Sequence, residues 1–230
     1  MFKIIAEYQD FIIVDKGAGI NFHDEGVLGT GLHSQVKAQL NQYGATDELY
    51  PVHRLDKMTS GLLIFAKTLA CAKIFGLLFE QHKIEKYYLA LSDKKPIKKQ
   101  GLIQGDMAKS RRGMFKLLRT TVNPAVTQFY SYHIDNKQRL FLLKPHSGKT
   151  HQLRVALSSL GSPITGDPLY YSQSNADRGY LHAYALRFTY QGSSFEFNTA
   201  PHEGHYFVSV AMKERLLTLK KPWQLNWPRL

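Results

Sequence analysis

Hydrophobic and polar positions alternate over short runs of this chain, and β-branched and aromatic residues gather between polar turns. Runs of that kind are typical of β-strands, whose successive side chains point to opposite faces of a sheet. The strands predicted in this way are Lys3–Ala6, Phe11–Val14, Gly61–Lys67, Lys86–Leu91, Val126–Ile134, Leu140–Lys144, Leu181–Tyr190 and Phe195–Asn198. Strands therefore dominate, and consecutive runs look like antiparallel neighbours.

Apolar residues spaced three or four apart predict helices between these strands. The signals that start and stop them are a Thr or Ser cap and a terminal glycine. The predicted helices run from Leu32 to Gly44, from the cap Thr68 to about Gln81, from Thr150 to Gly161, and from about Tyr206 to Leu217. Together the elements predict one α+β domain over residues 1–230, with a largely antiparallel sheet and flanking helices.

The charge balance narrows the classes of partner. The 230 residues carry 30 Lys and Arg against 18 Asp and Glu, a formal net charge of +12. Such a surplus favours polyanions, namely RNA, DNA or an acidic membrane surface, although a protein can also simply be basic.

Cysteine use and hydropathy indicate the compartment. The single cysteine, Cys71, excludes an intrachain disulfide and a thiolate-rich zinc site, and it fits a reducing cytoplasm. The N-terminus meets charge too early for a secretory signal, and Lys67 and Lys73 interrupt the most apolar stretch. We expect a cytoplasmic protein without a transmembrane segment.

Two short motifs resemble ligand sites and fail on spacing. "HSGKT" at His146–Thr150 lacks the glycine that a nucleotide-binding loop needs at position 143, which is Leu143. Its Lys149 and the following helix N-terminus still suit a phosphate. "HEGH" at His202–His205 places its histidines three apart where a zinc-binding helix needs four. We expect no metal.

A basic segment interrupted by Met114 and Phe115 lies in the middle of the chain. Its four cations are Lys109, Arg111, Arg112 and Lys116. A run of this kind is usually a solvated face, and in a basic chain it is also a candidate for phosphate contacts.

The stretch "HRLD" places His53, Arg54 and Asp56 directly before an apolar strand. Asp56 could cap a turn or pair with Arg54. It could also be a carboxylate kept ionised at the edge of a cleft for nucleophilic or general-base work. The aspartate alone does not decide between these interpretations.

Four motifs occur in a fixed order: "HRLDKMTSGLLIFAK", "EKYYLAL", "HSGKTHQLRVALSSLGSPITGDPLY" and "LHA". Together they resemble the RluA-like family of pseudouridine synthases, from the N-terminal strands to about Phe188. The resemblance implies the catalytic fold of that family without the small N-terminal RNA-binding domain that many members carry. Two departures are visible: "KGAG" at Lys16–Gly19 replaces Lys-Pro-Ala-Gly, and Ala156 stands where a histidine is common.

The resemblance also implies an activity, in which uracil leaves its ribose within an RNA chain and reattaches through carbon 5. No cofactor or metal is implied. Asp56 matches the family's catalytic aspartate, Arg154 the basic residue that pairs with it, and Tyr88 the active-site tyrosine. Tyr87 is a rival to Tyr88, and strand alternation sends the two to opposite faces. Arg54 would fill the space that an extruded uridine leaves.

The expected partner is ribosomal or transfer RNA, bound by a monomer. The residues predicted to contact RNA are His53, Arg54, Lys109, Arg111, Arg112, Lys149 and His151. One alternative is an RNA-binding module that keeps the fold without activity. Another is a hydrolase of glycosidic bonds, for which Asp167 in "TGDPLY" would be the second acid.

Overall fold

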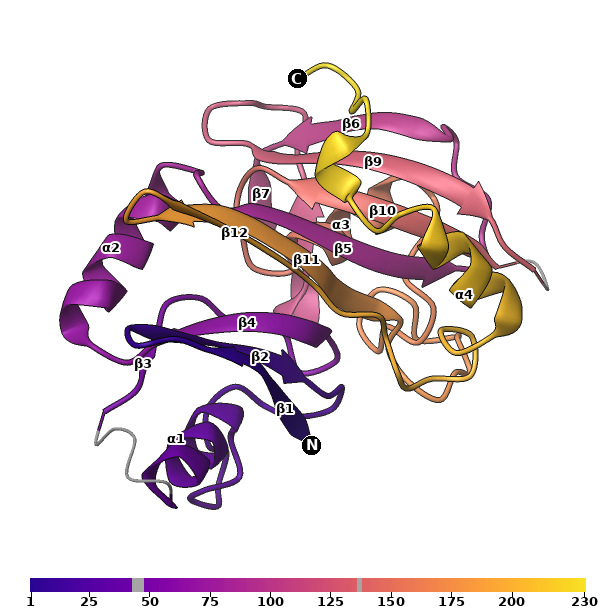
Figure 1. Ribbon diagram of the computed structural model, residues 1–230. Helices are drawn as coiled ribbons and strands as arrows, with labels where there is room; N and C mark the ends of the chain where they lie inside the picture. Colours follow the sequence, from indigo (N-terminus) through magenta and orange to yellow (C-terminus); the bar gives the residue numbers. More distant parts are fainter. Residues whose placement is uncertain (43–47, 136–137) are drawn as a thin grey trace. The chain divides into compact units, whose positions relative to one another are not determined.

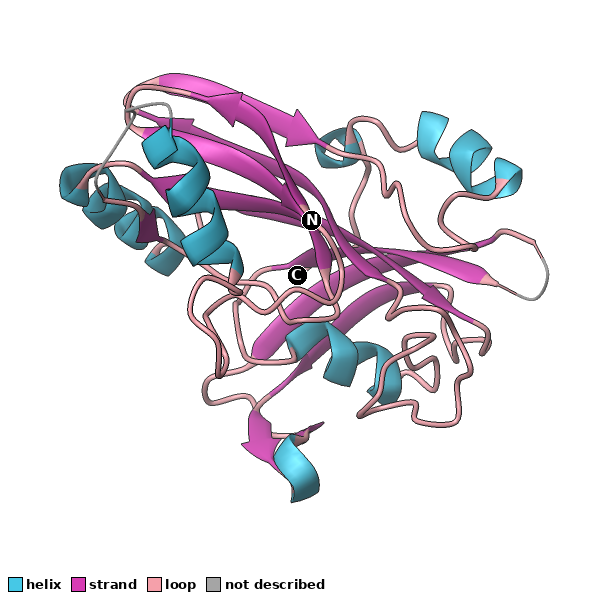
Figure 2. Ribbon diagram, turned by 90° about the horizontal axis from the view of Figure 1, so that it is seen from below, coloured by secondary structure: helices cyan, strands magenta, loops and turns pink. Residues whose placement is uncertain are grey.

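The computed structural model describes residues 1–42, 48–135 and 138–230. The chain divides into two compact units, Met1–Ile84 and Glu85–Leu230. Both units are built around antiparallel strands, with helices beside them (Figures 1 and 2). The α+β class with a largely antiparallel sheet is therefore confirmed, and a single domain over residues 1–230 stays a prediction.

The first unit has a small antiparallel sheet in the order β1-β2-β4, with the short β3 beside one end of β4. Every residue of β2 and β4 is buried, as expected for strands rich in Ile, Leu, Val and Phe. The bounds of its elements are β1 Phe2–Glu7, β2 Phe11–Lys16, α1 Leu32–Gln42, β3 Tyr50–Pro51, β4 Ser60–Ala66 and α2 Leu69–Glu80.

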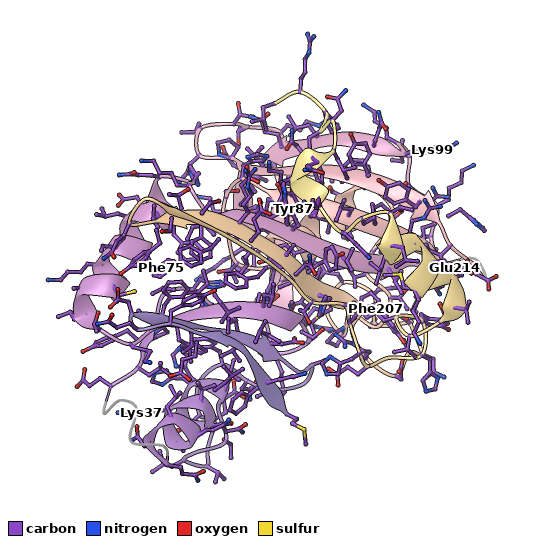
Figure 3. The ribbon with its side chains drawn as sticks, viewed as in Figure 1. Lys37, Phe75, Tyr87, Lys99, Phe207 and Glu214 are labelled. Carbon is purple, nitrogen blue, oxygen red and sulfur yellow. The ribbon has the colours of Figure 1, made fainter. Side chains whose placement is uncertain are left out.

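The predicted cap of α2 is confirmed, because the Thr68 side chain accepts a hydrogen bond from the backbone N–H of Cys71 at 3.1 Å. Phe75 of this helix lies edge-on to Phe11 of β2, with ring centroids 5.4 Å apart (Figure 3). This contact joins the helix to the sheet. The predicted end of α1 at Gly44 falls outside the described residues.

The second unit has a six-stranded antiparallel sheet in the order β12-β11-β5-β10-β9-β6, together with a separate hairpin of β7 and β8. The bounds are β5 Glu85–Ser92, β6 Gln100–Gly105, β7 Met107–Lys109, β8 Phe115–Leu117, β9 Ala125–His133, β10 Arg139–Pro145, β11 Leu181–Tyr190 and β12 Ser193–Asn198. The predicted strands are all present. Strands β6, β7 and β8 were not predicted, since glycines and charges break their alternation.

Two helices of the second unit start later than the sequence predicted. α3 spans Gln152–Ser159, and its N-cap is His151 in the left-handed conformation (φ 57°), not Thr150. α4 spans Val210–Leu217, and the Ser209 side chain caps it, so the start at Tyr206 was wrong. The residues before it form turns, because Pro201 and Gly204 (φ 96°) do not favour a helix.

The C-terminal segment packs on one face of this sheet (Figure 3). A short 3-10 helix, Pro222–Gln224, presents Trp223 to Tyr87 of β5, with ring centroids 6.2 Å apart, and Trp227 lies 5.8 Å from the same ring. Tyr130 of β9 donates its hydroxyl to the carbonyl of Asn226. This segment therefore covers part of the sheet.

None of the described helices has the length and apolarity that crossing a bilayer requires. The longest of them, α2, has 12 residues, and a membrane-spanning helix needs about 20.

Candidate active site

Asp56 lies in the loop that enters β4, and backbone hydrogen bonds hold this loop in shape. The N–H of Thr59 donates to the carbonyl of Asp56 at 3.0 Å, closing a turn. Beneath it, Lys16 at the end of β2 is fully buried and donates its ammonium to the carbonyls of Lys57 (3.1 Å) and Thr59 (2.7 Å). The N–H of Gly19 also donates to the carbonyl of Lys57, at 2.8 Å. These hydrogen bonds thus fix the turn that follows Asp56.

Sequence reasoning missed the role of Lys16, although the signal was present as a lysine at the end of a strand that begins with the apolar run Phe11–Val14. A buried ammonium needs acceptors, and carbonyls of a non-helical loop supply them. The departure from the family pattern at the next position also has a structural counterpart. The N–H of Gly17 donates to the carbonyl of Met1 at 2.9 Å, a hydrogen bond that a proline could not make.

His53, at the start of the same loop, contacts the strand that the loop enters. Its Nε2 accepts the N–H of Ile64 in β4 at 2.9 Å, and its ring lies 4.8 Å from that of Phe79 in α2. Accepting at Nε2 requires the tautomer with its proton on Nδ1. His53 therefore has a structural contact, while its contact with RNA stays a prediction. Arg54 beside it is exposed.

The adjacent tyrosines of β5 occupy different environments. Tyr87 is fully buried among the aromatic residues of the C-terminal segment, and burial raises its pKa well above the ordinary value. Tyr88 is half-buried and pairs with Leu143 of β10 on one side and Ala183 of β11 on the other. A register shift in β11 begins at Ala183, and such bulges often adjoin active sites. Tyr87 is thus packed against the C-terminal segment, and the choice of Tyr88 over Tyr87 as the catalytic tyrosine stays a prediction.

Arg154, in the first turn of α3, forms a two-pronged ion pair with Asp167. Its Nε donates to Oδ2 and its Nη2 to Oδ1, each at 2.7 Å, and the two side chains are 5% and 0% exposed. Asp167 also accepts the backbone N–H groups of Leu169 (2.9 Å) and Tyr170 (3.0 Å). The ring of Tyr170 lies 5.1 Å from the guanidinium carbon. The direction of this guanidinium is therefore fixed.

This geometry bears on two sequence-based interpretations. One would make Arg154 a partner of a carboxylate, and its side chain is indeed buried, at 4% exposed. Asp167 is a poor second acid for a hydrolase, because it is fully buried and both its oxygens hold Arg154. A guanidinium has five N–H donors, so the pair is compatible with a further carboxylate partner. The pairing of Arg154 with Asp56 stays a prediction.

The basic segment forms the hairpin β7–β8, which we call the basic hairpin (residues 107–117). Its four cations, Lys109, Arg111, Arg112 and Lys116, are all exposed. Arg112 at the tip has φ 53°, a conformation that costs of order 1–3 kcal/mol for a non-glycine residue and is enriched at functional sites. Below the hairpin, the Asp106 carboxylate accepts the N–H groups of Val122 (3.0 Å) and Asn123 (2.8 Å).

The other two residues predicted to contact RNA have partners inside the second unit. Lys149 donates its ammonium to the side-chain oxygen of Asn123 at 2.8 Å. The Nδ1 of His151 is 3.1 Å from the hydroxyl of Tyr170, and its ring lies edge-on to Phe115. Both residues thus lie where the basic hairpin meets α3, and their contacts with RNA stay predictions.

The "HEGH" stretch is a loop, and its Glu203 pairs with Arg178 at 3.3 Å. Within the part of the chain that the structure describes, no three His, Cys, Asp or Glu side chains gather as metal ligands would.

Comparison with known proteins decides the family. The sequence pattern of the family described as RNA pseudouridylate synthase matches residues 10–159, which include Asp56, Tyr88 and Arg154. This chain belongs to the RluA-like family of RNA pseudouridine synthases. Its enzyme class is therefore an isomerase that acts within one molecule, converting uridine in RNA to pseudouridine.

Relatives of this pseudouridine synthase support the assignment to the family. A Haemophilus influenzae protein described as an uncharacterized RNA pseudouridine synthase is 46% identical over 223 residues, 96% of this chain and 97% of its own. The ribosomal large subunit pseudouridine synthase C of Rickettsia bellii is 36% identical over 73% of this chain and 56% of its own. The solved structure of human RNA pseudouridylate synthase domain containing 1 matches with a TM-score of 0.74 and 23% identity, over 96% of this chain and 95% of that one. The last match confirms the fold.

Proposed function

We propose that this pseudouridine synthase uses Asp56 as its catalytic carboxylate, with Arg154 orienting it and Tyr88 facing the target base. The observation that carries the proposal is the construction of the Asp56 loop. A buried lysine and two backbone hydrogen bonds fix it at the mouth of β4, inside the matched family region. Preorganisation of this kind is what a group must have if it is to meet a reacting atom within a fraction of an ångström.

The reaction assigns a task to each residue. The bond between N1 of uracil and C1′ of ribose breaks, and a bond between C5 and C1′ forms. The C5 proton leaves, and N1 gains a proton, so no electrons are exchanged with another molecule. Asp56 as the anion attacks C1′ or removes a ribose proton. A guanidinium beside it favours that anion, and the hydroxyl of Tyr88 assists removal of the C5 proton.

We further propose that the substrate is ribosomal or transfer RNA, and that the basic hairpin contacts its phosphates. The support is the exposure of all four hairpin cations and the net charge of +12. Electrostatic contacts of this kind supply affinity without sequence information. The enzyme would extrude the target uridine from its stack, and Arg54 would occupy the gap.

The test is Asp56→Asn, which keeps the shape of the side chain and removes its charge. We expect loss of pseudouridine formation, measured as tritium release from RNA labelled at uracil C5, with RNA binding by filter titration nearly unchanged. The matched control is Asp93→Asn, the same change on an exposed residue of the second unit, which should retain full release. Robust tritium release by the Asp56 variant would remove this residue from catalysis, and release of free uracil by the wild type would indicate a hydrolase instead.

A further inference from the structure

We propose that Tyr170 is a positioning residue that anchors the basic hairpin to the α3 segment carrying Arg154, and thereby places the hairpin for RNA binding. The inference rests on the proposed function, because it assigns the hairpin to RNA and Arg154 to the active site. It adds a residue to which no role in the reaction has been assigned. Tyr170 is half-buried, at the end of the "TGDPLY" stretch.

The hydroxyl of Tyr170 holds the hairpin by its backbone. The N–H of Phe115, the first residue of β8, donates to this hydroxyl at 2.8 Å. Phe115 is 55 positions away from Tyr170 in sequence, and it is followed directly by the cation Lys116. A hydroxyl that accepts from a backbone N–H still has its own proton to donate, and Nδ1 of His151 lies 3.1 Å away. One oxygen therefore connects the hairpin with the N-cap of α3.

The ring and backbone of the same residue hold Arg154. The guanidinium carbon lies 5.1 Å from the ring centroid, within the range of a cation–π contact. The N–H of Tyr170 donates to Oδ1 of Asp167 at 3.0 Å, the oxygen that also receives Nη2 of Arg154. A displacement of the hairpin that moved the tyrosine would thus act on the two groups that set the direction of the guanidinium.

A second chain of hydrogen bonds joins the base of the hairpin to α3 and limits how far the hairpin can move. Asn123, held at its N–H by Asp106 at the base of the hairpin, accepts the ammonium of Lys149 at 2.8 Å. Lys149 precedes α3 by three residues, and its N–H donates to the Gln152 side chain at 3.0 Å. This link is exposed, whereas the Tyr170 link is part-buried, so the tyrosine is the stronger candidate for the anchor.

Tyr170→Phe tests the inference, because it removes the hydroxyl and retains the ring and the backbone N–H. RNA from cells lacking the gene, labelled at uracil C5, is the substrate. We expect KM to rise roughly threefold to tenfold, the size of one lost hydrogen bond, while kcat stays near the wild-type value. Tyr171→Phe is the matched control, since its hydroxyl contacts Asp93 at 3.1 Å away from the hairpin, and its KM should not change.

A double-variant cycle separates anchoring of the hairpin from simple destabilisation. Arg111→Ala with Arg112→Ala removes the hairpin charges, and each lost phosphate contact should lower the slope of log affinity against log salt by roughly 0.7–0.9. If Tyr170 acts through the hairpin, adding Tyr170→Phe to that variant should raise KM no further. Additive effects on KM, a loss confined to kcat, or an unchanged KM would each overturn the anchoring role.

Two readouts distinguish failure of the inference from failure of the proposed function. Amide hydrogen exchange at Phe115 should accelerate in Tyr170→Phe without any RNA present; unchanged protection would overturn the inference alone. If the double arginine variant keeps the wild-type KM and salt slope, the hairpin does not bind RNA, and the proposed function fails at that point irrespective of Tyr170.

Discussion

Asp167→Asn should lower stability and turnover together, because it removes one prong from the buried ion pair with Arg154. The two hydrogen bonds of 2.7 Å join side chains that are 5% and 0% exposed. An asparagine amide can accept from only one of the two donor nitrogens, and its NH₂ group would face the other. Breaking a buried pair on one side costs about 3–5 kcal/mol, because the remaining charge keeps its burial without compensation.

For a chain of 230 residues, each kcal/mol shifts Tm by about 2–4 °C, so the expected loss is about 6–20 °C. Thermal unfolding followed by circular dichroism measures it, and single-turnover tritium release at a temperature where the variant is folded measures the chemistry. Asp93→Asn is the control, because an exposed change should stay within about 0.5 kcal/mol. A Tm within 2 °C of that control, or a wild-type single-turnover rate, would refute the reasoning.

Two further predictions concern lysines, the fully buried Lys16 and the half-buried Lys86. Lys16→Met removes the donor to the carbonyls of Lys57 and Thr59, so single-turnover rates should fall at least tenfold while RNA binding persists; a wild-type rate would show that the Asp56 loop holds its shape unaided. Burial lowers the pKa of Lys86 to about 8. Between pH 8 and about 10.5 the unfolded chain therefore binds more protons than the native protein, and stability rises with pH by up to about 3 kcal/mol. Urea unfolding at pH 7.5 and pH 10 should show that rise in the wild type relative to Lys86→Met, and equal pH dependence in the two proteins would contradict it.

The core strands could be predicted from the sequence because buried strands show as alternating apolar and polar residues or as continuous apolar runs. β4 and β11 appear within one residue of their predicted bounds. The basic hairpin could not be predicted, since β7 and β8 have three residues each and depend on a contact with Tyr170 far along the chain. Short strands without a buried face have little local signal.

The residues proposed for the candidate site come from the sequence, whereas their structural partners could not be predicted from it. Motif resemblance identified Asp56, Tyr88 and Arg154, yet it gave Asp167 only as a possible second acid. An aspartate near a glycine and a proline looks like a turn residue in sequence. Only the fold shows that it is fully buried and holds Arg154 at both oxygens. The same holds for Lys16, whose acceptors are carbonyls that no side-chain pattern reveals.

The tyrosine pair of β5 raises a question that the sequence does not answer, namely which of the two faces of the sheet is covered. Alternation requires Tyr87 and Tyr88 to face opposite ways, but it does not say which face of the sheet is covered. The C-terminal segment decides this, because Trp223 and Trp227 pack on Tyr87 and Lys144 lies 5.3 Å above its ring. The tail is separated from β5 by well over a hundred residues, so no local pattern connects them. By covering Tyr87, the tail assigns that face to packing, and this supports our proposal that Tyr88 is the tyrosine of this pair that faces the target base.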